Sequence, residues 1–499
     1  MLSVLLFLLL TFNQFAQAQI TNKGKEFWVA GVEQKFRSNG DFWNAMRVYI
    51  LAEDTAQVTY AIPGTKRDIT VYPGQTKTIE FINTLIQRQE GKGNKTIHIT
   101  SDQDISVFAL NHGEDRLPTI FGNHKEATLV QPNHVLGSNY LIMTYLGSDY
   151  ESGPSNMIIV GTQDGTAVEI VPSVNTQGGL IAGDTTIITL NTGETYYLKS
   201  DNDLSGTSIR SVANDNGMCH NLAVYAGNFW TTIDNNIRSC PIISGSLYEQ
   251  MFPISTWGKE YLYQPFHAET DVRGDLVRVM AAYDHTKIQV TGEAEIELQK
   301  GQYYTFERLE EPRRITSNKP IAVGQFGRIG GCVNDLNMTV ATGGPTFTML
   351  NPIEQADTDI RFHTVQIMAS PTQTNVKQTA FLALTAPAGT NDQILLDGQN
   401  ILGRFKTIGD LAYTTIQIDS GIHRLESSHG VNGYLYTTIN DSRSSIGFSI
   451  GSALENLNLE ILAEDEFLGD VGEENLVCRN AEVSFEAEFD TFPGEEPRF

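Results

Sequence analysis

The sequence predicts an all-β fold of tandem β-sandwich-like modules, built from four degenerate repeats of about 100–120 residues each. Val, Ile, Thr and Tyr recur in short runs that are separated by many of the 44 Gly, a composition typical of strands between tight turns. Several runs alternate apolar with polar residues, as half-buried strands do. A series of landmarks then recurs in the same order along the chain, which indicates internal repetition.

The opening of each repeat is the first landmark. It carries a glycine three residues before an aromatic residue, at Gly24-Lys25-Glu26-Phe27, Gly137-Ser138-Asn139-Tyr140 and Gly258-Lys259-Glu260-Tyr261. Apolar segments ending in proline precede the later openings, at Leu129-Val130-Gln131-Pro132, Gln250-Met251-Phe252-Pro253 and Met349-Leu350-Asn351-Pro352.

The interior of each repeat follows one order of events. Turns centred on Asp or Asn come first, at Asp54-Thr55, Asp164-Gly165-Thr166, Asp284-His285-Thr286 and Asn391-Asp392. Short acceptor side chains suit such turns. Glycine hairpins follow at Gly74, Gly193, Gly301 and Gly421, and apolar strands close the repeats at 105–111, 222–228, 321–327 and, less clearly, 433–436.

These landmarks divide the chain into segments with different expected roles. We expect β modules at 22–131, 132–252, 253–351 and 352–450. The acidic stretch 452–475 is expected to be a solvated linker. Residues 476–499 start a new alternating pattern, Val483-Ser484-Phe485-Glu486-Ala487, and we expect them to begin an immunoglobulin-like or PKD-like module.

The first 18 residues resemble a secretory signal peptide. An apolar run too short to span a bilayer is followed by the small-residue site Ala16-Gln17-Ala18, although no Lys or Arg precedes the run. No later apolar stretch is long enough for a transmembrane helix. The sequence therefore predicts a secreted or cell-surface protein.

Charge and cysteine content narrow the class of partner. The chain has 34 basic and 59 acidic residues, a net charge of -25, so it repels phosphate backbones and nucleic acid is not expected as a partner. Export permits disulfides. Cys219 and Cys240 lie in one repeat and are the candidate bridge, whereas the states of Cys332 and Cys478 stay open.

No catalytic motif is found in the sequence. The ten His are scattered outside any HExxH pattern, and no GxSxG elbow or phosphate-binding glycine loop occurs. His423 and His429 are more consistent with a structural pair than with a metal site. Asp54, Asp164 and Asp284 hold equivalent turn positions in separate repeats, so turn capping explains them better than catalysis. We therefore expect no enzyme activity.

Two short motifs point to binding. Arg273-Gly274-Asp275 is an adhesion tripeptide, and its ordinary interpretation is a turn leading into a strand. The acidic clusters Asp201-Asn202-Asp203 and Glu464-Asp465-Glu466 offer oxygen ligands for calcium, although neither has EF-hand spacing. No other cofactor is expected.

The landmarks together resemble the N-terminal domain of the IgG Fc-binding protein family, which also occurs in exported bacterial surface proteins. The resemblance runs from about residue 20 to about residue 450. It is carried by Gly24-Lys25-Glu26-Phe27-Trp28-Val29, the Asp54 turn, Ser101-Asp102-Gln103-Asp104-Ile105-Ser106-Val107, Trp257-Gly258-Lys259-Glu260-Tyr261 and Ser317-Asn318-Lys319-Pro320-Ile321-Ala322-Val323. It implies a binding function and transfers no ligand-contact residue.

Three functional hypotheses follow. The first is a surface adhesion or ligand-binding protein whose partner is an extracellular protein or glycoconjugate, such as a mucin, a glycoprotein or an envelope protein. The second is a structural spacer that presents a downstream module. The third is a carbohydrate-active enzyme on a β scaffold, which needs two facing carboxylates.

Overall fold

The computed structural model describes most of the chain between the N-terminal leader and the C-terminal tail. The described residues are 21–35, 42–82, 84–115, 125–147, 152–233, 244–266, 274–327, 344–365, 378–389, 394–439, 445–457, 460–463 and 466–470. The predicted signal peptide and the predicted C-terminal module at 476–499 lie outside them.

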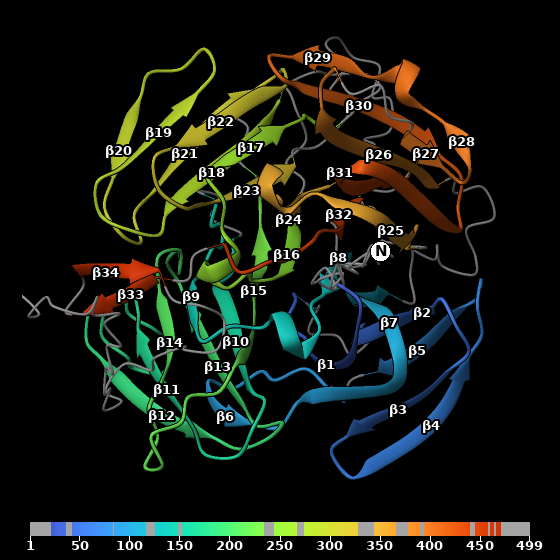
Figure 1. Cartoon of the computed structure of the whole chain (residues 1–499). Helices are drawn as coiled ribbons and strands as arrows, with labels where there is room; N and C mark the ends of the chain where they lie inside the picture. The colour runs from blue at the N-terminus through green and yellow to red at the C-terminus, as the bar shows by residue number, and fades with distance from the viewer. Residues whose placement is uncertain are drawn as a thin grey trace, which may run out of the picture.

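Four β-sandwiches surround a common axis (Figure 1). Module 1 contains β1 (Gly24–Ala30), β2 (Phe42–Ala52), β3 (Ala56–Ile62), β4 (Thr65–Val71), β5 (Thr76–Ile82), β6 (Gly91–Gly93), β7 (Thr96–Asp115) and β8 (Lys125–Val130). Module 2 contains η1 (Asn133–Val135), β9 (Asn139–Leu141), β10 (Ser155–Gly161), β11 (Thr166–Val171), β12 (Thr186–Leu190), β13 (Thr195–Ser200), β14 (Ser208–Val212), β15 (Leu222–Thr231) and β16 (Gly245–Gln250).

Modules 3 and 4 continue around the axis in the same order. Module 3 contains η2 (Ile254–Thr256), β17 (Glu260–Tyr263), β18 (Asp275–Ala281), β19 (Thr286–Val290), β20 (Ile296–Leu298), β21 (Tyr303–Leu309), β22 (Arg313–Ser317), β23 (Ile321–Gly327) and β24 (Thr346–Met349). Module 4 contains η3 (Ile353–Gln355), β25 (Asp357–His363), β26 (Gln378–Pro387), β27 (Ile394–Leu396), β28 (Gln399–Asn400), η4 (Leu402–Arg404), β29 (Lys406–Ile408), β30 (Leu411–Ile418), β31 (Ile422–Ile439) and β32 (Ser445–Gly451).

The predicted all-β fold of four repeated modules is confirmed. Each module has two β layers. Modules 2 and 3 have two separate sheets each, whereas in module 1 the long strand β7 runs through both layers. Its first half pairs with β1 and β3, and its second half pairs with β2 and β8.

The last strand of each module lies on the axis. β8, β16, β24 and β32 pair with the closing strands β7, β15, β23 and β31 of their own modules. They also contact one another in the cyclic order β8, β16, β24, β32, β8, as the centre of Figure 1 shows. The four modules therefore form a closed ring.

The inner sheet of a module is buried on both faces, which explains the uninterrupted apolar runs in these strands. On β18, for example, Val277 and Val279 belong to the core of module 3, whereas Leu276 and Met280 pack into the core of module 2. All seven residues of β18 are buried. Since a strand with apolar side chains on both faces needs a partner on both, each module depends on its neighbour.

The ring closes between the last module and the first. Phe108 and Leu110 on β7 share a hydrophobic cluster with Ile360, Phe448 and other residues of module 4. The rings of Phe108 and Phe448 meet edge-on at 5.6 Å. Lys23, just before β1, forms an ion pair at 2.7 Å with Glu53 and donates to the carbonyl oxygen of Asp359 in module 4.

The repeated glycine and tyrosine at each opening have clear structural roles. The Tyr140 hydroxyl accepts the N–H of Gly137 (3.0 Å) and donates to the carbonyl oxygen of Leu222 (2.6 Å), so it joins the opening to the closing strand. Tyr261 makes the same pair of hydrogen bonds with Gly258 and Ile321. The first repeat has Phe27 at this position and so has no hydroxyl there.

The openings also lock one module to the next. A Cβ atom on Gly258 would lie 2.3 Å from Cβ of Pro352, and one on Gly137 would lie 2.5 Å from Cβ of Pro253. In both cases the proline begins the following module. Glycine is needed at these two positions because the backbone lies very close to the pyrrolidine ring of the proline.

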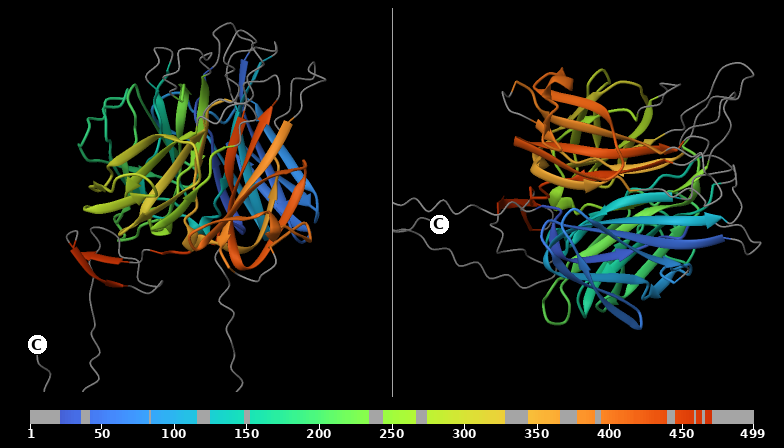
Figure 2. Two further views of the ribbon diagram at one scale, coloured as in Figure 1. Left: turned by 90° about the horizontal axis from the view of Figure 1, so that it is seen from above. Right: turned by 90° about the vertical axis from the view of Figure 1, so that its right-hand side faces the viewer.

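The chain leaves the ring after β32. The N–H of Leu457 donates to the carbonyl oxygen of Ser255 in η2. Within the stretch predicted as an acidic linker, β33 (Glu460–Ala463) pairs antiparallel with β34 (Glu466–Asp470). Part of this stretch is thus a hairpin, and Figure 2 shows it beyond one end of the ring.

Candidate functional site

The cysteine and adhesion-motif predictions fall partly on described residues. Cys219 is disulfide-bonded, but Cys240, Cys332 and Cys478 lie outside the described residues, so the pairing with Cys240 stays a prediction. Arg273 also lies outside them. Asp275 is 4% exposed at the start of β18.

The carboxylate of Asp275 is used inside the protein. Its Oδ2 accepts hydrogen bonds from the Phe266 N–H (2.8 Å), from Gln325 Nε2 (2.7 Å) and from the Tyr263 hydroxyl (3.2 Å). Gly274, with a φ of +67°, makes the turn that places it there. The Asp of the tripeptide therefore supports the turn into β18, and the adhesion role of the tripeptide stays a prediction.

The Asp201-Asn202-Asp203 cluster has a structural use as well. Asp201 accepts a hydrogen bond from Gln177. Asp203 turns inward to Arg278 of the next module, with Nη1 and Oδ2 2.7 Å apart. Glu464 and Asp465 of the second predicted cluster lie outside the described residues. No group of three or more His, Cys, Asp or Glu within the described part of the chain is arranged to hold a metal ion.

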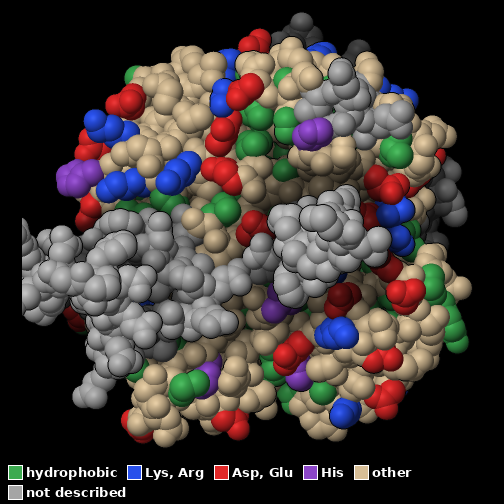
Figure 3. All heavy atoms as spheres, in the orientation of Figure 1, with side chains coloured by type: hydrophobic (Ala, Val, Ile, Leu, Met, Phe, Trp, Pro, Cys, Tyr) green, Lys and Arg blue, Asp and Glu red, His purple; other side chains and the backbone are tan. Residues whose placement is uncertain are grey.

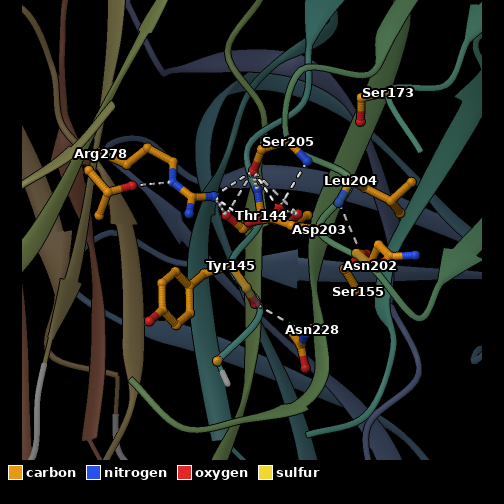
Figure 4. Close-up of polar contacts among 12 residues, drawn as sticks. Thr144, Tyr145, Ser155, Ser173, Asn202, Asp203, Leu204, Ser205, Asn228 and Arg278 are labelled. Atoms are coloured by element: carbon orange, nitrogen blue, oxygen red, sulfur yellow. Dashed lines mark hydrogen bonds and ion pairs between the residues drawn. The ribbon is translucent and has the colours of Figure 1, made fainter. Parts of the chain in front are cut away.

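Arg278 is the centre of the polar seam between modules 2 and 3 (Figure 4). Its Nη1 donates to the carbonyl oxygen of Thr144 (2.6 Å) and to Ser205 Oγ (2.7 Å), in addition to Asp203. Its Nε donates to Thr305 Oγ1 (3.1 Å), and its guanidinium lies 4.1 Å from the ring centre of Tyr303.

The charge of this seam is balanced inside the protein. Burial opposes ionisation of Asp203, but Arg278 and the hydroxyls of Thr144 and Ser205 outweigh it, so the pKa of Asp203 lies below its ordinary value. Arg278 is 4% exposed. An ion pair this well enclosed is costly to break, and this one joins two modules.

A second polar cluster lies on the axis. Glu126 on β8 accepts a hydrogen bond from Thr346 Oγ1 on β24 (3.1 Å), which joins modules 1 and 3 across the ring centre. Glu249 on β16 accepts one from the Thr128 hydroxyl on β8. The same Thr128 oxygen accepts the N–H of Gln250 (3.1 Å). These two carboxyls connect three of the four axial strands.

Both axial carboxyls favour the neutral acid. Burial raises the pKa of Glu126 and of Glu249 well above 4.5, and the proximity of Glu249 raises that of Glu126 further. A pair of carboxyls with shifted pKa values is one mark of a glycosidase site. Here they are 0% and 4% exposed and bond to threonines of neighbouring strands, so their position fits a role in joining strands.

His423 and two of the turn aspartates that the sequence singled out, Asp164 and Asp284, have structural partners. His423 Nδ1 lies 2.7 Å from Oδ2 of Asp397, and its Nε2 lies 2.9 Å from the carbonyl oxygen of Asp419. Asp164 and Asp284 accept the N–H groups of Thr192 and Lys300, in the adjoining glycine hairpins. Both carboxylates thus accept backbone hydrogen bonds, as predicted, but the N–H groups belong to the adjoining hairpin and not to the turn of the aspartate.

The sequence singled out Asp203 of the seam, as a candidate calcium ligand, but neither Arg278 nor the axial Glu126 and Glu249. Arg278 lies in an apolar run, Leu276-Val277-Arg278-Val279, and a lone arginine in an alternating strand ordinarily faces solvent. Glu126 and Glu249 precede the proline of the next module at unequal spacing, so the repeat comparison did not align them. The apolar run around Arg278 was the one available sign that both faces of β18 are covered.

Comparisons with curated proteins and with solved structures support no argument about this chain. No curated protein matches the chain. One solved structure, described as "Ca2+-stabilized adhesin helps an Antarctic bacterium reach out and bind ice", is 9% identical, with coverage of 86% of this chain and 98% of that one. Its TM-score of 0.11 is too low to support an argument about fold or function.

The family comparison matches more than half of the chain. A model of the IgGFc binding protein family matches residues 126–437. The match begins in the axial strand β8 and ends in β31, so it spans modules 2 and 3 and most of module 4. The structure also contains the repeated modules whose sequence landmarks resemble this family. Because the family model matches more than half of the chain, the chain belongs to the IgGFc binding protein family.

Proposed function

We propose that this chain is an exported surface protein that binds an extracellular protein or glycoconjugate through the outer surfaces of its ring. The family match over residues 126–437 is the observation that carries the proposal, because the family is one of binding proteins. The signal-like N-terminus and the net charge of -25 support export and a soluble surface.

The geometry supports binding by the exterior rather than by an interior pocket. The polar clusters described above join modules to one another and are buried. The face in Figure 3 shows acidic and basic side chains interspersed, with hydrophobic side chains in small separate areas. Large exposed hydrophobics of the described residues are spread over three modules, at Tyr72, Ile82, Ile181, Ile187, Met218 and Tyr304. Such a surface suits polar, shape-dependent recognition.

A rigid ring also favours this function. Since neighbouring modules share buried sheets, the positions of surface groups on different modules are fixed relative to one another. Preorganised groups lose less conformational entropy on binding than groups on flexibly linked domains.

A binding array tests the proposal. The mature chain from Gln19 is applied to glycans, mucins, immunoglobulin Fc and extracellular-matrix proteins, and an unrelated folded protein of similar net charge serves as the control. We expect saturable binding to at least one ligand class that persists at ionic strengths where exposed charges are screened. Association that is only non-saturable and salt-sensitive, and that the control shares, would reject the proposal in favour of a spacer.

A further inference from the structure

The outermost strands of the four inner sheets differ in what covers them. In module 2 the edge of β13 is covered by β6 of module 1, with Tyr196 opposite Lys92. In module 4 the edge of β30 is covered by β29. Among the described residues, no strand covers the corresponding edge of β21 in module 3 or of β5 in module 1.

The tyrosines of modules 2 and 3 show the difference directly. Tyr196 lies opposite Ile159 on β10, and Tyr304 lies opposite Val279 on β18, each three residues after its hairpin glycine. Tyr196 is partly buried and packs against a hydrophobic core. Tyr304 is 45% exposed, edge-on to Phe306 at 4.9 Å between ring centres. The same position is therefore covered in one module and bare in the next.

The difference between these modules comes from the chain between two strands. In module 1 the stretch between β5 and β7 is long enough to carry β6 across to module 2. In module 2 the corresponding stretch between β13 and β14 is short. It reaches module 3 at Gly206, where a Cβ atom would lie 2.6 Å from the carbonyl oxygen of Gly301, but it contributes no strand.

The two uncovered edges are not alike. β5 carries the charged residues Lys77 and Glu80, and Glu80 forms an ion pair with Arg47. Charged residues on an edge strand discourage pairing with another strand. β21 also carries charged residues, Glu307 and Arg308, but they lie in its second half. Its first four residues, Tyr303 to Phe306, are uncharged and have high β propensity. Of these two edges, β21 is the better template for an added strand.

The C-terminal tail contains a segment that fits this edge. Residues 482–490 alternate strictly, with the apolar side chains Val483, Phe485, Ala487 and Phe489 separated by Glu482, Ser484, Glu486, Glu488 and Asp490. Such a strand has one apolar and one acidic face. These residues lie outside the described part of the chain.

The tail also starts from the right module. The Leu457 N–H donates to the carbonyl oxygen of Ser255 in η2, at the beginning of module 3. The β33–β34 hairpin ends at Asp470, and the 12 residues from Asp470 to Glu482 span roughly 40 Å in extended form. That reach is about twice the length of an ordinary strand, which is about 17–20 Å.

We propose that residues 482–490 add to the free edge of β21 as a further strand within the same chain, with their apolar side chains over Tyr304 and Phe306. The added strand takes the place that β6 takes on β13. Its acidic side chains lie on the opposite face, on the same side of the sheet as Tyr303 and Thr305.

Hydrogen exchange on the full mature chain tests this proposal. The amides of β21 are compared between the wild type, Phe485→Asp/Phe489→Asp and the matched control Glu486→Gln/Glu488→Gln. We expect exchange at β21 to be at least tenfold faster in the first variant and unchanged in the control. Exchange at β5 should be the same in all three proteins. Equal exchange at β21 in the wild type and the Phe variant would overturn the proposal.

Two further outcomes decide the source of the strand. Protection of β21 that rises with protein concentration assigns the strand to a second copy and overturns the same-chain proposal. Protection of the tail amides without protection of β21 indicates a separate module, and overturns it too. The variant Tyr304→Ser, at an exposed site, should make the tail more sensitive to protease without changing the unfolding of the ring.

Discussion

Arg278 illustrates how a single buried charge fixes the relation between two modules. Its guanidinium is 4% exposed, and it donates to Asp203, Ser205 and the backbone of Thr144. Removing one partner of such a pair strongly lowers the free energy of unfolding, because the other partner is left as a buried charge without a counter-charge.

Replacing Arg278 tests this account. Arg278→Met should lower the free energy of unfolding by about 3–5 kcal/mol, because Asp203 loses its counter-charge. Adding Asp203→Asn should recover part of that loss. Arg308→Met is the control, since Arg308 and Glu310 are both about half exposed, and it should cost less than about 1 kcal/mol. Denaturant unfolding measures all three, and equal losses for Arg278→Met and Arg308→Met would contradict the assigned role.

The hydroxyl of Tyr140 provides a second test with a smaller change. Tyr140→Phe leaves the Gly137 N–H and the Leu222 carbonyl without their shared partner, so we expect a loss of about 1–3 kcal/mol in unfolding free energy. Tyr72→Phe, at a side chain that is 53% exposed, should have almost no effect. A Tyr140→Phe protein as stable as the wild type would show that the hydroxyl does not join opening and closing strands as we infer.

The axial strands are joined partly by the carboxyl groups of Glu126 and Glu249, whose raised pKa values favour the protonated, neutral form. In the unfolded chain the carboxyls of Glu126 and Glu249 ionise near 4.5, whereas in the ring their pKa values are raised, chiefly by burial. Between the two values the folded chain binds more protons than the unfolded chain. The stabilising contribution is therefore complete below about pH 4.5 and is lost as the pH rises.

Substitution of both carboxyls should remove this dependence. Over the pH range between the unfolded and folded pKa values, the wild type should lose up to about 1.4 kcal/mol per pH unit per carboxyl relative to Glu126→Gln/Glu249→Gln. Urea unfolding from pH 5 to 9 measures the difference. Glu80→Gln is a control of opposite sign, because His112 is the main cause that lowers the pKa of Glu80 to about 2. The stability that the lowered pKa of Glu80 gives the wild type over Glu80→Gln is present above pH 4.5 and is lost as the pH falls from 4.5 toward about 2. Parallel stability curves for wild type and double variant would contradict the axial assignment.

Individual elements differ in how far the sequence could predict them. The sequence predicted that Asp164 lies in a turn because it stands beside Gly165, but it did not identify the hydrogen-bond donor, the N–H of Thr192, 28 residues away. Whether the edge of β21 is covered depends instead on the length of the segment between β13 and β14, which is too short to contribute a strand to module 3. No local pattern in Tyr303 to Leu309 distinguishes it from β13, which has a similar composition and is covered.

The arrangement of the whole molecule was the least accessible to sequence reasoning. Repeated landmarks predicted four modules, and those landmarks include the Gly137 and Gly258 contacts that lock each module to the next. Closure of the ring depends on contacts between residues more than 300 positions apart, such as Phe108 and Phe448. The apolar strand 105–111 showed that Phe108 is buried, but it did not identify the module that buries it.

Ring closure is the central claim, and native-state hydrogen exchange on Phe448→Ala tests it most directly. The substitution removes a buried ring from module 4 and should cost about 3–5 kcal/mol. If the ring is one cooperative unit, amides of β2 and β7 in module 1 should lose the same protection as amides of β26 and β31 in module 4. Loss of protection confined to module 4, with module 1 unchanged, would contradict the closed ring.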